Sequence, residues 1–101
     1  MCIALVGGMD RTARHYETAA MKYGVDLHHF ESDGPRFEQK LSGMDGIVIF
    51  TNRISHSARK RALSKGQSKG IPILMCHSCG ISSLKRCLDE IMLTRNNRTM
   101  I

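Results

Sequence analysis

The sequence predicts an α/β domain with three layers, in which helices cover both faces of a four-stranded parallel sheet. Short apolar runs alternate with helical patterns four times along 101 residues, and the connections between them are short. Alternation of this kind produces parallel strands joined by right-handed crossovers. We expect the strand order 2-1-3-4, with residues 1–94 as one domain and residues 95–101 as a frayed basic tail.

The first half of the chain is expected to form two strands and two helices. Residues 2–6 are a short apolar run, which is typical of a buried strand, and apolar residues recur at helical spacing over 13–23. Gly24 is expected to end that helix. Residues 25–30 are more polar and alternate, which predicts an edge strand, and residues 35–41 are expected to form a short helix.

The second half repeats the strand–helix pattern. Residues 46–50 are the clearest buried strand, and a helix is expected from its N-cap, Ser55, to about residue 69. Pro72 opens the fourth strand, where a missing N–H is tolerated, and the apolar run 73–76 follows. The last helix has an apolar stripe at spacings of three and four, formed by Ile81, Leu84, Leu88 and Ile91.

The chain is basic, with a net charge of +6 and a pI near 9.5. This balance suits small anions, nucleic acid or acidic partners. The basic residues of the third helix could contact nucleic acid phosphates, but no aromatic residues interleave them, and a solvated helix face is favoured. These residues are Arg59, Lys60, Arg61, Lys65 and Lys69.

The sequence also indicates the cellular compartment of the protein. No apolar run reaches the roughly 20 residues that a membrane-spanning helix needs, and the first residues lack the basic start of a signal peptide. We therefore expect a cytoplasmic protein. In a reducing cytosol, the four cysteines argue against structural disulfides and for metal, redox or plain buried thiols. A four-stranded sheet has two open edges, so a homodimer is also expected.

Polar turns follow the first, third and fourth strands, and ligands of parallel sheets bind beyond the carboxyl ends of the strands. The leading hypothesis is a binding or sensing module that holds a small anion at this rim. The absence of a Ser-His-Asp arrangement and of paired carboxylates favours a non-enzymatic role. The expected ligand-binding residues are Gly7, Gly8, Asn52, Ser55, His56, Ser78, Ser82 and Ser83. A tight turn at the glycines, a simple helix cap at Ser55 and a surface histidine at position 56 remain alternatives.

The segment Cys76-His77-Ser78-Cys79, at the end of the fourth strand, supports a second hypothesis. A CxxC pair at a helix N-terminus is typical of reversible disulfide chemistry. The same cysteines, with His77 or His56, offer soft ligands for a transition metal ion, which is the one cofactor that the sequence suggests. Inert, buried thiols are the third interpretation.

Four local features occur in an order and spacing that are specific only in combination. They are Val6-Gly7-Gly8 after the first strand, His28-His29 in the second, Thr51 to Ser55-His56 after the third, and Gly80-Ile81-Ser82-Ser83-Leu84 at the start of the last helix. Together they resemble the uncharacterised bacterial domain-of-unknown-function family 2325, over nearly the whole chain. The resemblance implies a flavodoxin-like, Rossmann-like module that is sometimes attached to other domains, and it implies no activity. The cysteine pair is not expected in every relative, so thiol or metal chemistry would be local to this chain.

Overall fold

Strands and helices alternate along the whole chain. The computed structural model describes residues 1–8, 13–30, 34–51, 54–77 and 80–100, with the side chains of all of these except 13 and 94–100. The strands are β1 (Cys2–Val6), β2 (Asp26–Phe30), β3 (Gly46–Phe50) and β4 (Ile73–Cys76). The helices are α1 (Ala13–Met21), α2 (Phe37–Leu41), α3 (His56–Lys69) and α4 (Ile81–Met100). The predicted α/β class is confirmed.

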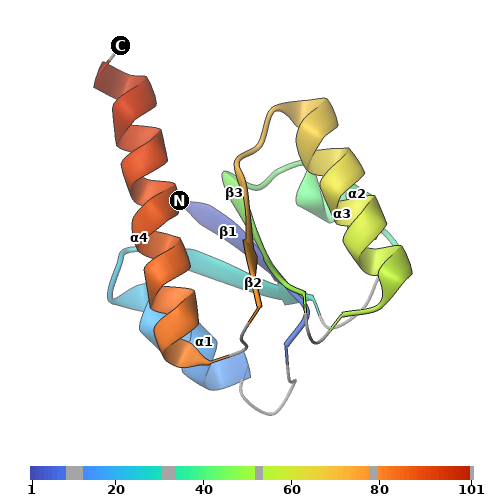
Figure 1. Ribbon diagram of the computed structural model, residues 1–101, viewed down its shortest axis with the longest axis horizontal. Coiled ribbons are helices and arrows are strands. Elements are labelled where there is room, and N and C mark those ends of the chain that lie inside the picture. The colour runs from blue at the N-terminus through green and yellow to red at the C-terminus, as the bar shows by residue number, and fades with distance from the viewer. Residues whose placement is uncertain (9–12, 31–33, 52–53, 78–79, 101) are drawn as a thin grey trace.

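The four strands form one parallel sheet in the predicted order, β2-β1-β3-β4. Helices α1 and α4 lie on one face of the sheet, and α2 and α3 lie on the other (Figure 1). In the register of the sheet, Ile3 of the central strand β1 is opposite both Leu27 and Gly46. Strand β2 is at an edge, as the polar sequence of residues 25–30 predicts, and β4 forms the other edge.

The alternation of side chains along β1 divides the apolar core into two halves. Ile3 and Leu5 belong to the half under α1 and α4, whereas Ala4 and Val6 belong to the half under α2 and α3. All four are completely buried. A strand covered on both faces must be apolar at every position, which explains why β1 and β3 read as continuous apolar runs.

Helix α4 extends well beyond the sheet, so the C-terminal end of the chain lies away from the other elements (Figure 1). It continues to Met100 and therefore includes most of the segment 95–101 that was expected to fray. Neither glycine nor proline occurs between residues 81 and 101, so no residue of that kind ends the helix. Among the described residues, no helix is both long enough and apolar enough to cross a membrane.

An ion pair links the two helices on the second face. Arg61 of α3 donates to Oε1 of Glu38 of α2 from Nε (2.8 Å) and from one terminal nitrogen (2.6 Å). The Arg61 guanidinium also lies 5.7 Å from the ring centroid of Phe37. Since α2 has only five residues, it depends on tertiary contacts, which are these together with the burial of Phe37 and Leu41 in the core.

We expect Arg61→Ala to lower the free energy of unfolding by about 1 kcal/mol, because it removes a half-exposed ion pair and a cation–π contact. Urea denaturation measures the change, with Lys60→Ala, an exposed neighbour on the same helix, as the matched control. The ionic part of the effect should shrink in high salt. An equal loss in both variants would show that the Arg61 contacts do not stabilise the docking of α2.

Candidate functional site

The carboxyl ends of the strands meet at one rim, and backbone hydrogen bonds connect the turns there. Gly7, which follows β1, donates its N–H to the carbonyl of Phe30 at the end of β2 (2.8 Å). Thr51, which follows β3, donates its N–H to the carbonyl of Cys76 at the end of β4 (2.8 Å). At the rim, one backbone hydrogen bond therefore connects the end of β1 to the end of β2, and another connects the end of β3 to the end of β4.

Gly7 and Gly8 turn the chain at the end of β1, with φ angles of 95° and 88°. Nε2 of His29 donates to the Gly7 carbonyl at 2.8 Å. A Cβ at position 8 would lie only 3.0 Å from Cδ2 of Phe50. Backbone conformation and packing thus account for both glycines, and their part in anion binding stays a prediction.

Ser55 and His56 begin helix α3. Ser55 is the N-cap, and its hydroxyl accepts from the N–H of Ala58 at 3.2 Å, as expected of a helix cap. The exposed His56 side chain lines a hollow of about 310 Å³ together with Arg59 and Lys60. The hollow at His56 therefore lies among basic side chains of the same helix.

A second cavity, of about 320 Å³, lies where β4 meets α4. A disulfide joins Cys76, the last residue of β4, to Cys87 of α4. The residues that line the cavity include Cys76, His77, Ser83, Arg86, Cys87 and Glu90. This cavity thus brings together three residues that were predicted to be functional, Cys76, His77 and Ser83, and Cys76 is one half of the disulfide.

The disulfide corrects the expected partner of Cys76. Cys76 is bonded to Cys87, whereas the CxxC spacing had suggested Cys79 as its partner. Cys87 follows Leu84 by three residues and is only 6% exposed, so it belongs to the apolar stripe that α4 turns towards the sheet. That position on the stripe was the signal that could have identified it.

Thr51 links the end of β3 to His77. Its hydroxyl donates to the Cys76 carbonyl at 3.2 Å and lies 3.0 Å from Nδ1 of His77. A hydroxyl has one proton, so Thr51 cannot donate to the Cys76 carbonyl and to His77 at once. In the tautomer with the imidazole proton on Nδ1, His77 donates to Thr51, and the lone pair on Nε2 is left to bind a metal ion.

The remaining predicted residues lie at the start of α4 or outside the described part of the chain. Ser82 is exposed on the first turn of α4. Asn52, Ser78 and Cys79 fall outside the described residues. His56 lines one of the two hollows described above, and the Cys76–Cys87 disulfide lines the other. That these segments hold one common ligand therefore stays a prediction.

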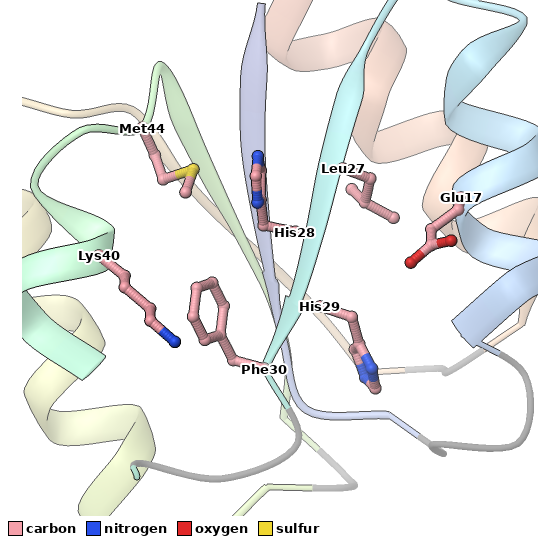
Figure 2. A pocket seen from close by; sticks show the side chains of 7 residues that line it. All are labelled: Glu17, Leu27, His28, His29, Phe30, Lys40 and Met44. Atoms are coloured by element: carbon pink, nitrogen blue, oxygen red, sulfur yellow. The ribbon is translucent and has the colours of Figure 1, made fainter. Parts of the chain in front are cut away.

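A third hollow, of about 600 Å³, follows the open edge of β2 and contains none of the predicted site residues. Figure 2 shows His28, Phe30, Lys40 and Met44 on one side of the strand, and Leu27, His29 and Glu17 on the other. The lining residues therefore lie on both sides of the edge strand. The hollow lies at an unpaired edge of the sheet, which is one of the surfaces that the expected homodimer would cover, and the homodimer stays a prediction.

The comparison with known proteins finds one matching family. The family described as "Uncharacterized protein conserved in bacteria (DUF2325)" matches residues 2–91 of the 101. The chain belongs to this family. No curated protein matches it. Membership of DUF2325 confirms the resemblance that the sequence suggested. Since the family is uncharacterised, the function has to be argued from the side chains of this chain.

Proposed function

We propose that the protein carries out thiol–disulfide exchange at the Cys76–Cys87 pair. The observation that carries this proposal is that both cysteines line one cavity, so a small thiol can approach the bond although each cysteine residue is no more than 9% exposed. His77 and Arg86 line the same cavity. Arg86 and Glu90 both line the cavity, so the attraction of Arg86 for an approaching thiolate acts against the repulsion from Glu90. His77 offers a proton acceptor.

The exchange needs a dithiol partner. One thiolate of the partner attacks a sulfur of the cystine, the S–S bond breaks, and the released cysteine sulfur takes the electron pair and a proton. The second thiol of the partner then attacks the mixed disulfide, which releases the other cysteine and leaves the partner as a disulfide. The protein gains two electrons and two protons, and the dithiol loses them.

Equilibration with reduced and oxidised dithiothreitol at a series of ratios, followed by thiol trapping and peptide mass mapping, tests the proposal. We expect Cys76 and Cys87 to become trappable together in a single two-electron transition, while the free cysteine Cys2 is trapped at every ratio. The Cys79→Ser variant is the matched control and should keep the transition. Loss of the transition in that variant would assign the chemistry to the CxxC pair, and permanent trapping of Cys76 would contradict the proposal.

The metal alternative at the same cysteines applies to the reduced protein. While Cys76 is bonded to Cys87 it has no thiolate to offer a metal ion. A site made of Cys76, Cys79 and a histidine therefore requires the disulfide to be opened first. Elemental analysis of the reduced and the oxidised protein would separate the two states.

We also propose, as a second function, that a small anion binds at the rim of the sheet. Arg86 beside the cystine cavity, the three polar turns and the net charge of +6 support it. Thermal shift with inorganic phosphate tests it, and Arg86→Gln should lose any stabilisation that Arg59→Gln keeps. The absence of a shift with phosphate, nucleotides and carboxylates would count against it.

Nucleic acid binding through α3 remains the weaker alternative, which a salt-sensitive gel shift would revive.

A further inference from the structure

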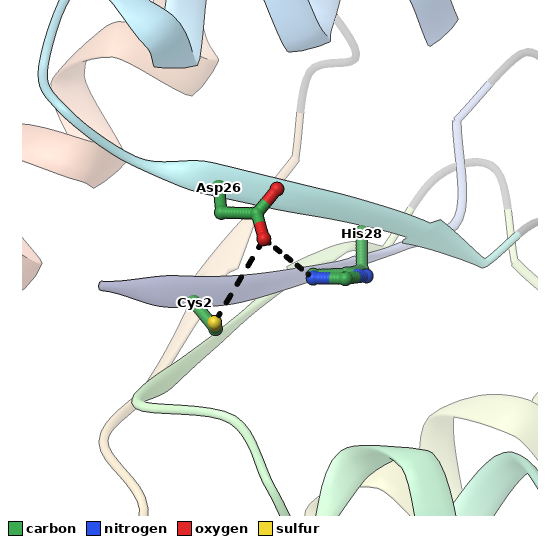
Figure 3. A group of neighbouring side chains, drawn as sticks. All are labelled: Cys2, Asp26 and His28. Carbon is green, nitrogen blue, oxygen red and sulfur yellow. Dashed lines mark hydrogen bonds and ion pairs between the residues drawn. The ribbon is translucent and has the colours of Figure 1, made fainter.

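A cluster of three potential metal ligands lies across β1 and β2, away from the predicted functional residues. Cys2 and Asp26 are opposite each other in the register of the two parallel strands. His28 follows Asp26 by two residues, so its side chain projects from the same face of the sheet. Figure 3 shows Cys2 and His28 on either side of the Asp26 carboxylate, which contacts both. His29 points to the opposite face, where its ring lies 6.0 Å from that of Tyr16.

The ligand atoms of the three residues are close enough to share one ion. Oδ2 of Asp26 is 3.3 Å from Nε2 of His28 and 4.0 Å from Sγ of Cys2. All three ligand atoms lie within 4.8 Å of one another. Ligands bound tetrahedrally at about 2.0–2.3 Å are roughly 3.3–3.8 Å apart. The two distances to Asp26 are close to this range, so small side-chain rotations suffice to close the site.

The backbone around the cluster is held by the sheet. The N–H of Cys2 donates to Oδ2 of Asp45 at 2.7 Å, and the N–H of Asp45 donates to the Cys2 carbonyl at 2.7 Å. The N–H of Asp26 donates to the carbonyl of Met1 at 2.8 Å. Positions on paired strands keep ligands in place better than positions on a loop.

We propose that Cys2, Asp26 and His28 bind a divalent transition metal ion of the zinc class. A thiolate, an imidazole and a carboxylate are the three ligand types that zinc takes in proteins, and the two anionic ligands balance its charge. Three protein ligands leave the fourth position for water or another small ligand. The Asp26 and His28 side chains are 72% and 43% exposed, so an ion reaches the site directly from solvent.

The competing explanation is a surface ion pair between Asp26 and His28 with a thiol nearby. Such a pair needs no metal and, because both side chains are well exposed, contributes little to stability. For the same reason, substitution of its members should leave the fold intact, so their effect on metal binding can be measured cleanly. The two explanations differ in one property, which is whether Cys2 and His28 act together on an added metal ion.

The test is titration of the metal-free, oxidised, full-length chain with Zn²⁺ against a competing chromogenic chelator. Co²⁺ serves as the spectroscopic substitute, because thiolate ligation gives an intense charge-transfer band. We expect one equivalent to bind and the band to vanish in Cys2→Ser. The affinity should fall in His28→Gln by at least the roughly 10–100-fold that loss of an outer-shell partner costs, because His28 is a direct ligand. Cys79→Ser and His15→Gln, which change the same residue types elsewhere, should bind like the wild type.

A second measurement does not depend on any variant. Zn²⁺ should protect the Cys2 thiol of the wild-type chain from alkylation, and peptide mass mapping distinguishes Cys2 from Cys79. The proposal is overturned if neither ion binds, if the cobalt band survives in Cys2→Ser, if it disappears in Cys79→Ser, or if Cys2 reacts at the same rate with and without Zn²⁺. The disulfide chemistry of Cys76 and Cys87 is unaffected by each of these results.

Discussion

Replacement of Phe50 by alanine is expected to lower the free energy of unfolding by about 3–5 kcal/mol, which is the usual cost of removing a buried aromatic side chain. Phe50 ends β3 and is completely buried in the core half under α1 and α4. Its ring meets that of Tyr16 edge-on, with centroids 5.6 Å apart. Tyr16 is only 1% exposed, so little freedom remains for α1 to close the cavity.

Urea denaturation of Phe50→Ala, Phe50→Leu and Met21→Ala measures this contribution. Phe50→Leu keeps most of the apolar volume and should cost about 1 kcal/mol. Met21 is a large apolar residue that is 73% exposed, so Met21→Ala should change stability by less than about 0.5 kcal/mol. For a domain whose total stability is about 5–15 kcal/mol, Phe50→Ala is a severe change. If Phe50→Ala lowers the free energy of unfolding no more than Met21→Ala does, the Phe50 ring does not contribute to the core as described.

The sheet was predictable because its determinants are local and repeated. Continuous apolar runs indicated that β1 and β3 are covered on both faces, and the mixed sequence of 25–30 indicated an edge. The order 2-1-3-4, which is that of flavodoxin-like sheets, is consistent with residues 25–30 at an edge. The length of α4 was harder to predict, because a polar and basic sequence is compatible both with a solvated helix and with a frayed end.

The sites were less predictable because they depend on contacts between distant segments. The spacing of the CxxC motif suggested a local pair, whereas the fold brings Cys76 to Cys87 on the inward side of α4. Similarly, Cys2 and Asp26 are 24 residues apart and meet only through the β1–β2 register. The sequence does indicate that His28 and His29 face opposite sides, but not which residues each side offers as neighbours.

Replacement of Gly8 by alanine is expected to lower the free energy of unfolding by about 2–5 kcal/mol in the absence of any ligand. Two independent costs add. A non-glycine residue with left-handed backbone angles costs about 1–2 kcal/mol, and the φ of Gly8 is 88°. The new Cβ would also lie 3.0 Å from Cδ2 of Phe50 and 3.4 Å from Cε2 of Tyr16. Crowding of a packed core adds about 1–3 kcal/mol.

Gly24→Ala is the matched control for the backbone cost. Gly24 has a φ of 70°, and a Cβ there would meet nothing within 4 Å, so only the conformational cost applies. The difference between the two variants therefore measures the clash with the rings. In a Phe50→Leu background the ring is gone, and Gly8→Ala should cost less than in the wild type, a coupling that double-mutant analysis detects. Equal costs for Gly8→Ala and Gly24→Ala, with no coupling to Phe50, would remove the packing explanation for Gly8 and strengthen the case that this glycine exists for a ligand.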